Sequence, residues 1–177
     1  MYGLAGERRL TELELEWLPG YDGARPVRIG NAASRQLQLD IYGEVLDVMY
    51  QSRRFGLQPE EAGWRLEEAL VAFVETAWEH PDEGIWEVRG PRRHFTHSKV
   101  MAWVALDRAV KTVEHFHVEG PVERWRRLRD TIHEQICHQG FDAARHTFVQ
   151  SYGAQELDAS LLLLPLVGFL PAADPRV

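Results

Sequence analysis

Apolar residues recur along the chain at the three- to four-residue spacing of amphipathic helices. The first such stretch, from about residue 32 to residue 55, has Asn31 as its expected N-cap and Gly56 as its expected C-terminal glycine. The second begins at "PEE" (59–61) and ends before Pro81, because proline cannot continue a helix. Only a few residues around "GLQPE" separate these two helices, so we expect them to form a hairpin.

The same spacing predicts a second pair of helices and a further apolar segment. The third helix is expected to begin near Ser98, and the fourth to cover 121–140. The fifth, "DASLLLLPLVGF" (158–169), opens with Asp158 as a cap and is apolar nearly all round, which predicts a buried helix. Strand signals are weak, and "HTFVQSY" (146–152) is the best candidate.

The connections between these helices alternate between short and long. Helices three and four are joined by a few residues around "HVEGP", whereas the connections from helix two to three and from four to five are long and polar. Hairpins that recur at roughly 60 residues, with all long loops at one end, are typical of helical toroids and solenoids. The sequence therefore predicts an all-α fold of stacked αα-hairpins, a partial toroid or a solenoid, in a single domain over residues 1–177.

The long loops hold the residues that could carry chemistry. We expect segments 20–31, 81–98 and 140–158 to meet at one end of the fold, where function concentrates. They bring together aromatic faces, acids and guanidinium groups: Trp86, Tyr21, Tyr152, Glu87, Asp22, Asp158, Arg25, Arg28 and Arg89. Aromatic faces stack on a sugar ring while charged groups bond its hydroxyls, so this set indicates a site for a polyhydroxylated ring.

Glu87 is the candidate general acid, because breaking a glycosidic bond requires a proton on the leaving oxygen. It follows Trp86 in "DEGIWEVRG" (82–90), and an adjacent indole would keep its carboxyl poorly solvated and protonated. The structural alternative is that Trp86 anchors the loop while Glu87 pairs with Arg89 or Arg92 on the surface. Asp158 has its own alternative, that of a simple helix cap.

Composition and short motifs exclude several other functions. A net charge of −7 disfavours nucleic-acid binding, and the single cysteine fits a reducing, cytoplasmic compartment. The longest apolar run, 161–171, is too short to span a membrane. His94 and His97 lack a third ligand, so we expect neither a metal nor a cofactor. A basic cluster is expected to form a solvated or salt-bridged rim, with phosphate binding as the alternative: Arg89, Arg92, Arg93 and Lys99.

Three stretches resemble bacterial family-15 glycoside hydrolases, which include glucoamylases, glucodextranases and some trehalases. They are "RPVRIGNAASRQLQLDIYGEVLD" (25–47), "DEGIWEVRGPRRHFTHSKVMAWVALDRA" (82–109) and "FVQSYGAQELDASLLLLPLVGFLP" (148–171). The resemblance implies an (α/α)6 barrel and inverting hydrolysis of α-glucosidic bonds by two glutamates, with Glu87 as the acid and Trp86 in the sugar pocket. Fungal members often have a second acid after the first, where this chain has Val88.

The resemblance also implies that the chain corresponds to a central piece of a longer enzyme. The family's catalytic base would lie beyond Val177, its Arg-Asp pair that grips the sugar would lie before residue 1, and an N-terminal β-sandwich would be missing. We therefore expect negligible hydrolysis by the isolated chain, and self-association or pairing with the remainder of the domain. The alternatives are a non-catalytic helical module that binds carbohydrate or another protein, and another α/α-toroid hydrolase or phosphorylase.

Overall fold

The computed structural model describes residues 3–57 and 61–177, and the chain divides into two compact units, Met1–Leu37 and Gln38–Val177. In the first unit, two short strands pair antiparallel and two 3-10 helices flank the second strand: β1 (Leu13–Glu14), β2 (Arg28–Ile29), η1 (Tyr21–Gly23) and η2 (Ala32–Arg35). The single domain that the sequence predicts over residues 1–177 stays a prediction.

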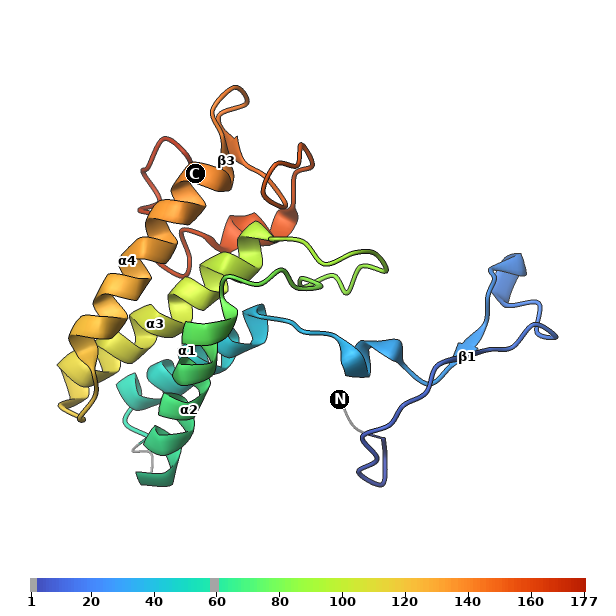
Figure 1. The fold of residues 1–177 in the computed structure, drawn as a ribbon, viewed down its shortest axis with the longest axis horizontal. Coiled ribbons are helices and arrows are strands. Elements are labelled where there is room, and N and C mark those ends of the chain that lie inside the picture. The colour runs from blue at the N-terminus through green and yellow to red at the C-terminus, as the bar shows by residue number, and fades with distance from the viewer. Residues whose placement is uncertain (1–2, 58–60) are drawn as a thin grey trace. The chain divides into compact units, whose positions relative to one another are not determined.

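The second unit is built on four α-helices (Figure 1): α1 (Asp40–Arg54), α2 (Glu61–Ala77), α3 (Thr96–Phe116) and α4 (Val122–Gln139). A small hairpin and a 3-10 helix follow them: β3 (Phe141–Asp142), β4 (Thr147–Phe148) and η3 (Ala159–Leu163). The all-α class is confirmed by this arrangement. The partial toroid stays a prediction, since four helices do not close a ring.

Helix α3 lies at the centre of the second unit and packs against α1, α2 and α4. Every residue from Thr96 to Val110 is buried, including three charged ones. Helix α1 approaches α3 closely at Gly43, where a Cβ atom would lie 2.2 Å from the carbonyl oxygen of Met101. Only glycine allows this backbone-to-backbone contact.

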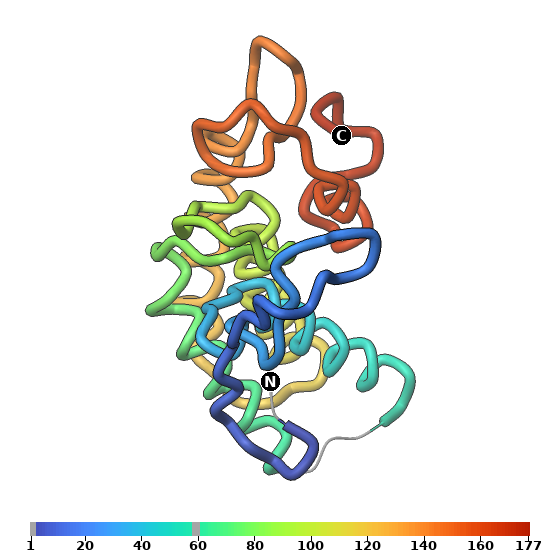
Figure 2. Tube along the Cα trace, turned by 90° about the vertical axis from the view of Figure 1, so that its right-hand side faces the viewer, coloured from blue at the N-terminus to red at the C-terminus, as the bar shows by residue number. Residues whose placement is uncertain are grey.

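The long and short connections lie at opposite ends of the helices, as the sequence predicts (Figure 1). Helices α1 and α3 begin at the end where α2 and α4 finish, and the long loops gather there. Figures 1 and 2 both show the β3–β4 hairpin projecting beyond the end of α4. This end of the second unit is therefore where loop side chains can meet.

The predicted first helix is wrong at its start. Asn31 does cap a helix, since its Oδ1 accepts from the Ala33 N–H at 2.8 Å, but that helix is the short η2. The backbone then becomes extended at Gln36, with ψ 147°, and α1 begins only at Asp40. Gly56 ends α1 with φ +87° as predicted, and positions 59 and 60 of the predicted second helix lie outside the described residues.

The predicted fifth helix is also wrong in its length and burial. Asp158 caps it as expected, accepting from the Ser160 N–H at 2.8 Å, but only the 3-10 helix η3 forms. Pro165 has no N–H to donate and so favours an early end. Leu162 and Leu166 are 75% and 78% exposed rather than buried, because the segment covers the core with one face only. The predicted strand at 146–152 is confirmed only for the two residues of β4.

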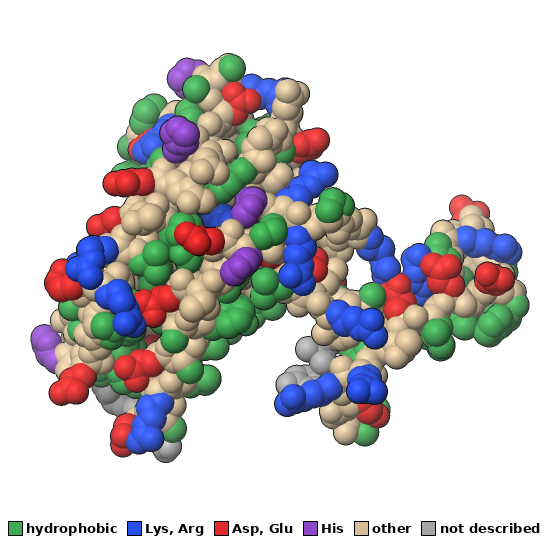
Figure 3. All heavy atoms as spheres, viewed as in Figure 1, with side chains coloured by type: hydrophobic (Ala, Val, Ile, Leu, Met, Phe, Trp, Pro, Cys, Tyr) green, Lys and Arg blue, Asp and Glu red, His purple; other side chains and the backbone are tan. Residues whose placement is uncertain are grey.

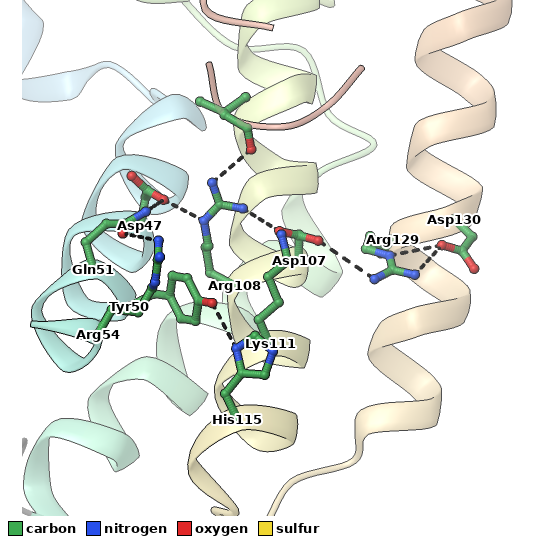
Figure 4. A network of polar contacts seen from close by, with 11 residues as sticks. Asp47, Tyr50, Gln51, Arg54, Asp107, Arg108, Lys111, His115, Arg129 and Asp130 are labelled. Atoms are coloured by element: carbon green, nitrogen blue, oxygen red, sulfur yellow. Dashed lines mark hydrogen bonds and ion pairs between the residues drawn. The ribbon is translucent and has the colours of Figure 1, made fainter. Parts of the chain in front are cut away.

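A network of charged side chains ties α1, α3 and α4 together (Figure 4). Arg108, buried in α3, donates from Nε to Asp47 Oδ1 of α1 at 2.5 Å and from Nη2 to the Val167 carbonyl at 2.8 Å. Its Nη1 donates to Asp107, whose other oxygen lies 3.8 Å from Arg129 of α4. The guanidinium thereby uses its planar set of donors to join three segments.

The surface of the described residues is mixed in charge. On the face drawn in Figure 3, acidic and basic side chains alternate over the helical unit. Among the described residues, no helix is both long enough and apolar enough to cross a membrane.

Candidate active site

The loop between α2 and α3, residues 81–95, carries the Trp-Glu pair. Its neck is closed by two backbone hydrogen bonds of 3.0 Å between Asp82 and Arg93, in an antiparallel bridge. Gly84 has φ +69°, and a Cβ atom there would lie 2.7 Å from the ring of Phe95. The glycine therefore lets the loop fold back onto the start of α3.

Trp86 is held at the loop tip by a residue 72 positions later in the chain. Its indole Nε1 donates to Asp158 Oδ1 at 2.9 Å and to Oδ2 at 3.0 Å, while 57% of the side chain stays exposed. An exposed indole with a fixed edge presents a rigid apolar face to solvent. That face is available to a ligand.

Asp158 has an electrostatic environment that favours its charged form. Burial raises the pKa of this carboxyl, but hydrogen bonds from Ser160, Trp86 and Gln150 outweigh burial, and the pKa lies below its usual value. Gln150 donates to Oδ2 at 3.1 Å. Asp158 is thus both the helix cap of the alternative reading and the anchor of the Trp86 ring.

Glu87 is exposed at the tip of the same loop, at the end of the unit where the long loops lie. The predicted shielding of its carboxyl by the indole of Trp86 stays a prediction, and the exposure of Glu87 does not favour it. The backbone of Glu87 is left-handed, with φ +49°. Such a conformation costs a non-glycine residue about 1–2 kcal/mol and is common at functional sites.

Arg89 and Tyr152 line two separate pockets beside the loop. Arg89 borders a cavity of about 200 Å³ with Val88 and Gln150. Tyr152 borders a more polar cavity of about 590 Å³ and stacks on His94 with ring centroids 5.8 Å apart. Burial raises the pKa of the Tyr152 hydroxyl well above its usual value.

Arg25 and Arg28 belong to the first unit. Arg28 forms ion pairs with Glu12 at 3.1 Å and with Glu14 at 2.7 Å, within the β1–β2 hairpin region. Their expected meeting with the loops of the second unit stays a prediction.

Two buried charges lie beneath the loop, and sequence reasoning missed both. Lys99, expected on a solvated rim, is 0% exposed and donates to the carbonyls of Trp78 and His80, just after α2. Asp82 is also 0% exposed, and its Oδ2 accepts from the Leu39 N–H at 3.0 Å. One feature of the sequence could have indicated that Lys99 is buried: it is followed by a run of apolar residues in "HSKVMAWVAL" (97–106).

The histidines of the basic segment form no metal site within residues 3–57 and 61–177, where no group of three or more potential ligands is present. His97 is buried, and burial lowers its pKa below the usual value while Asp158 opposes this. His97 is therefore best described as a neutral side chain packed behind the loop.

The fold of the chain is one that solved glycosidases share. A glycosidase variant in complex with glucose superposes with a TM-score of 0.69 at 19% identity, covering 89% of this chain and 43% of its own. A second glycosidase variant gives a TM-score of 0.67, also at 19% identity, over 90% of this chain and 44% of its own.

The chain belongs to the glycosyl hydrolases of family 15, whose model matches residues 1–177. A trehalase of Mycobacterium tuberculosis is 49% identical over all 177 residues, and a trehalase of Thermoplasma acidophilum is 38% identical over 99% of the chain. This chain spans 26% of the first protein's length and 30% of the second's.

Proposed function

We propose that this chain is the acid-bearing part of an inverting α-glucoside hydrolase that acts on trehalose. The observation that carries the proposal is the match over the whole chain to proteins described as trehalases, at 49% and 46% identity. Starch-type oligosaccharides are the second substrate class, because glucoamylases belong to the family that the sequence resembles.

Glu87 is the general acid in this proposal. Its carboxyl donates a proton to the glycosidic oxygen while the bond from that oxygen to the anomeric carbon breaks. Water attacks the opposite face of the sugar, assisted by a second carboxylate roughly 6.5–9.5 Å from the first. The fixed, left-handed backbone of Glu87 and its exposure at the loop tip support this role, because the carboxyl can reach a bound sugar.

Trp86 provides the apolar platform on which the sugar ring stacks, and Asp158 fixes the angle of that platform. A stacked sugar would cover the Glu87 carboxyl and remove water from it, which favours the protonated form that a general acid needs. Hydroxyl contacts are assigned to Arg89, Tyr152 and Asp158 of the second unit. The same role for Arg25 and Arg28 of the first unit stays a prediction from the sequence.

The isolated chain hydrolyses trehalose negligibly in this proposal, because it spans only 26–30% of its relatives and general-base assistance is worth about 100- to 10,000-fold. The test therefore uses a chimera in which this chain replaces the matched segment of the Mycobacterium tuberculosis trehalase. We expect the chimera to hydrolyse trehalose and Glu87→Gln to remove at least about 99% of that activity.

Glu83→Gln is the matched control. Glu83 lies in the same loop and pairs with Arg92 at 2.9 Å, so its loss tests the loop's charge without touching the acid. A folded chimera with no activity, or one in which Glu87→Gln and Glu83→Gln behave alike, contradicts the proposal. Circular dichroism of each variant establishes folding.

A further inference from the structure

Asp82 stands where the Trp-Glu loop leaves the helical body. Its backbone N–H and C=O both pair with Arg93 at 3.0 Å, so the two strands of the neck meet at this residue. Trp86 and Glu87 lie in the loop between Asp82 and Arg93. Any movement of Asp82 therefore moves the whole loop.

The side chain of Asp82 fixes this neck to α1. Oδ2 accepts from the N–H of Leu39, the residue at the N-cap position of α1, at 3.0 Å. That N–H belongs to the first turn of a helix and has no partner within the helix. Gln38 adds a second link, from its Nε2 to the Gly84 carbonyl at 3.3 Å. The start of α1 thus holds the loop at two successive points.

The buried positive charge of Lys99, on α3, also acts on the carboxylate of Asp82. Lys99 is itself anchored just after α2, where its Nζ donates to the His80 carbonyl at 2.6 Å. Burial raises the pKa of Asp82, and Lys99 opposes this shift. Both residues are 0% exposed, so their attraction is poorly screened. Asp82 therefore joins the start of α1 to the loop neck, close enough to Lys99 of α3 for the two charges to interact.

We propose that Asp82 is a positioning residue for Trp86 and Glu87. It acts through the loop neck: its carboxylate binds the N–H of Leu39 at the start of α1, and its backbone closes the loop that presents the indole and the acid. This inference rests on the proposed function only in naming Glu87 as the group that must be placed.

The experiment measures hydrogen exchange in the 15N-labelled chain of 177 residues, without sugar. The two reporters are the indole N–H of Trp86, assigned with Trp86→Phe, and the backbone N–H of Glu87, which bonds the Gly84 carbonyl at 3.3 Å. We expect Asp82→Ala to accelerate exchange of both by about 10-fold or more. Asp82→Asn keeps an acceptor for Leu39 but loses the charge, so it should give an intermediate rate.

The control is Glu67→Gln, which breaks the buried ion pair with Arg53 (2.6 Å) between α1 and α2. It lowers stability without touching the loop, so exchange at Trp86 and Glu87 should stay at the wild-type rate. Unchanged exchange in both Asp82 variants, or equal acceleration in Glu67→Gln, overturns the inference. If Asp82→Ala does not fold, the comparison of Asp82→Asn with wild type decides. Failure of Glu87→Gln to affect the chimera would reject the proposed function while leaving this result in place.

Discussion

The indole nitrogen of Trp86 donates to both carboxylate oxygens of Asp158, at 2.9 and 3.0 Å. One residue lies in the loop after α2 and the other caps η3, so the bond joins the two long loops of the helical unit. Asp158 also caps Ser160 and accepts from Gln150. The orientation of the aromatic platform therefore depends on one carboxylate.

Replacing Asp158 by asparagine should show what this carboxylate contributes. Asparagine can still cap η3 but has only one acceptor oxygen, so we expect a loss of about 1 kcal/mol in the free energy of unfolding at pH 7. The pKa of Asp158 is lowered in the folded state, because its hydrogen bonds outweigh the effect of burial. The stabilisation is thus present above the unfolded pKa of about 3.9 and lost as the pH falls through the folded value.

Urea unfolding of wild type and Asp158→Asn between pH 7 and pH 2.5 measures this difference. The two free energies should converge at the acid end of the range. A difference that is independent of pH would mean that the carboxylate charge does not stabilise the fold.

The left-handed backbone of Glu87 predicts which of two substitutions, to glycine or to alanine, gives the more stable protein. At φ +49°, alanine keeps the strain and glycine removes it, so Glu87→Gly should be more stable than Glu87→Ala by about 1 kcal/mol. At an ordinary backbone position the order is reversed, since glycine gains more entropy on unfolding. Thermal unfolding of the two variants checks this, and a more stable alanine variant would show that the residue is not left-handed.

Arg108 should be among the residues most important for stability. Arg108→Met removes the partner that Asp107 and Asp47 share, while Asp107 keeps Lys111 at 2.8 Å. Hydrogen bonds to charged groups contribute about 1.5–3 kcal/mol, so we expect a loss of this size in the free energy of unfolding. Arg65→Met is the control, because Arg65 is exposed on α2 and pairs with Glu61 one turn away. Denaturant midpoints compare the two, and equal small losses would show that the network in Figure 4 contributes little.

Lys99 should give the protein a stability that rises with pH. Burial lowers its pKa to about 8, with Asp82 and Glu79 opposing the shift, whereas the unfolded value is about 10.4. Between these values the unfolded chain binds more protons, so the free energy of unfolding increases with pH. Wild type should therefore gain stability relative to Lys99→Met between pH 7 and pH 9.5. Parallel pH profiles from urea unfolding would exclude a depressed pKa at Lys99.

The sequence predicted those parts of the fold that depend on local signals. Helical spacing, Pro121 and the glycines at 56 and 140 placed the end of α1, the start of α3 and both ends of α4 within a few residues, and loop lengths placed the long loops at one end. The start of α1 could not be predicted this way. The N–H of Leu39 is satisfied by Asp82, 43 residues later in the chain, and a local reading has no access to such a contact.

In the candidate site, too, some features could be predicted from local sequence and others depend on tertiary contacts. The Trp-Glu pair was found from its motif, and its resemblance to a known family gave it a role. The anchoring of Trp86 by Asp158 and the burial of Lys99 both depend on tertiary packing. The buried ammonium group of Lys99 is tolerated because it donates to the carbonyls of Trp78 and His80. Local propensity alone would place Lys99 on the surface, which is why the expectation for it failed.

The central claim, that Glu87 donates a proton to the leaving oxygen, is tested most directly with two substrates whose leaving groups differ. Cleavage of trehalose needs protonation of the glycosidic oxygen. Cleavage of α-glucosyl fluoride does not need a general acid, because fluoride departs as a stable anion. In the chimera, Glu87→Gln should lower trehalose hydrolysis by at least about 100-fold and fluoride release by less than about 10-fold. An equal loss on both substrates, or no loss on trehalose, would contradict the assignment.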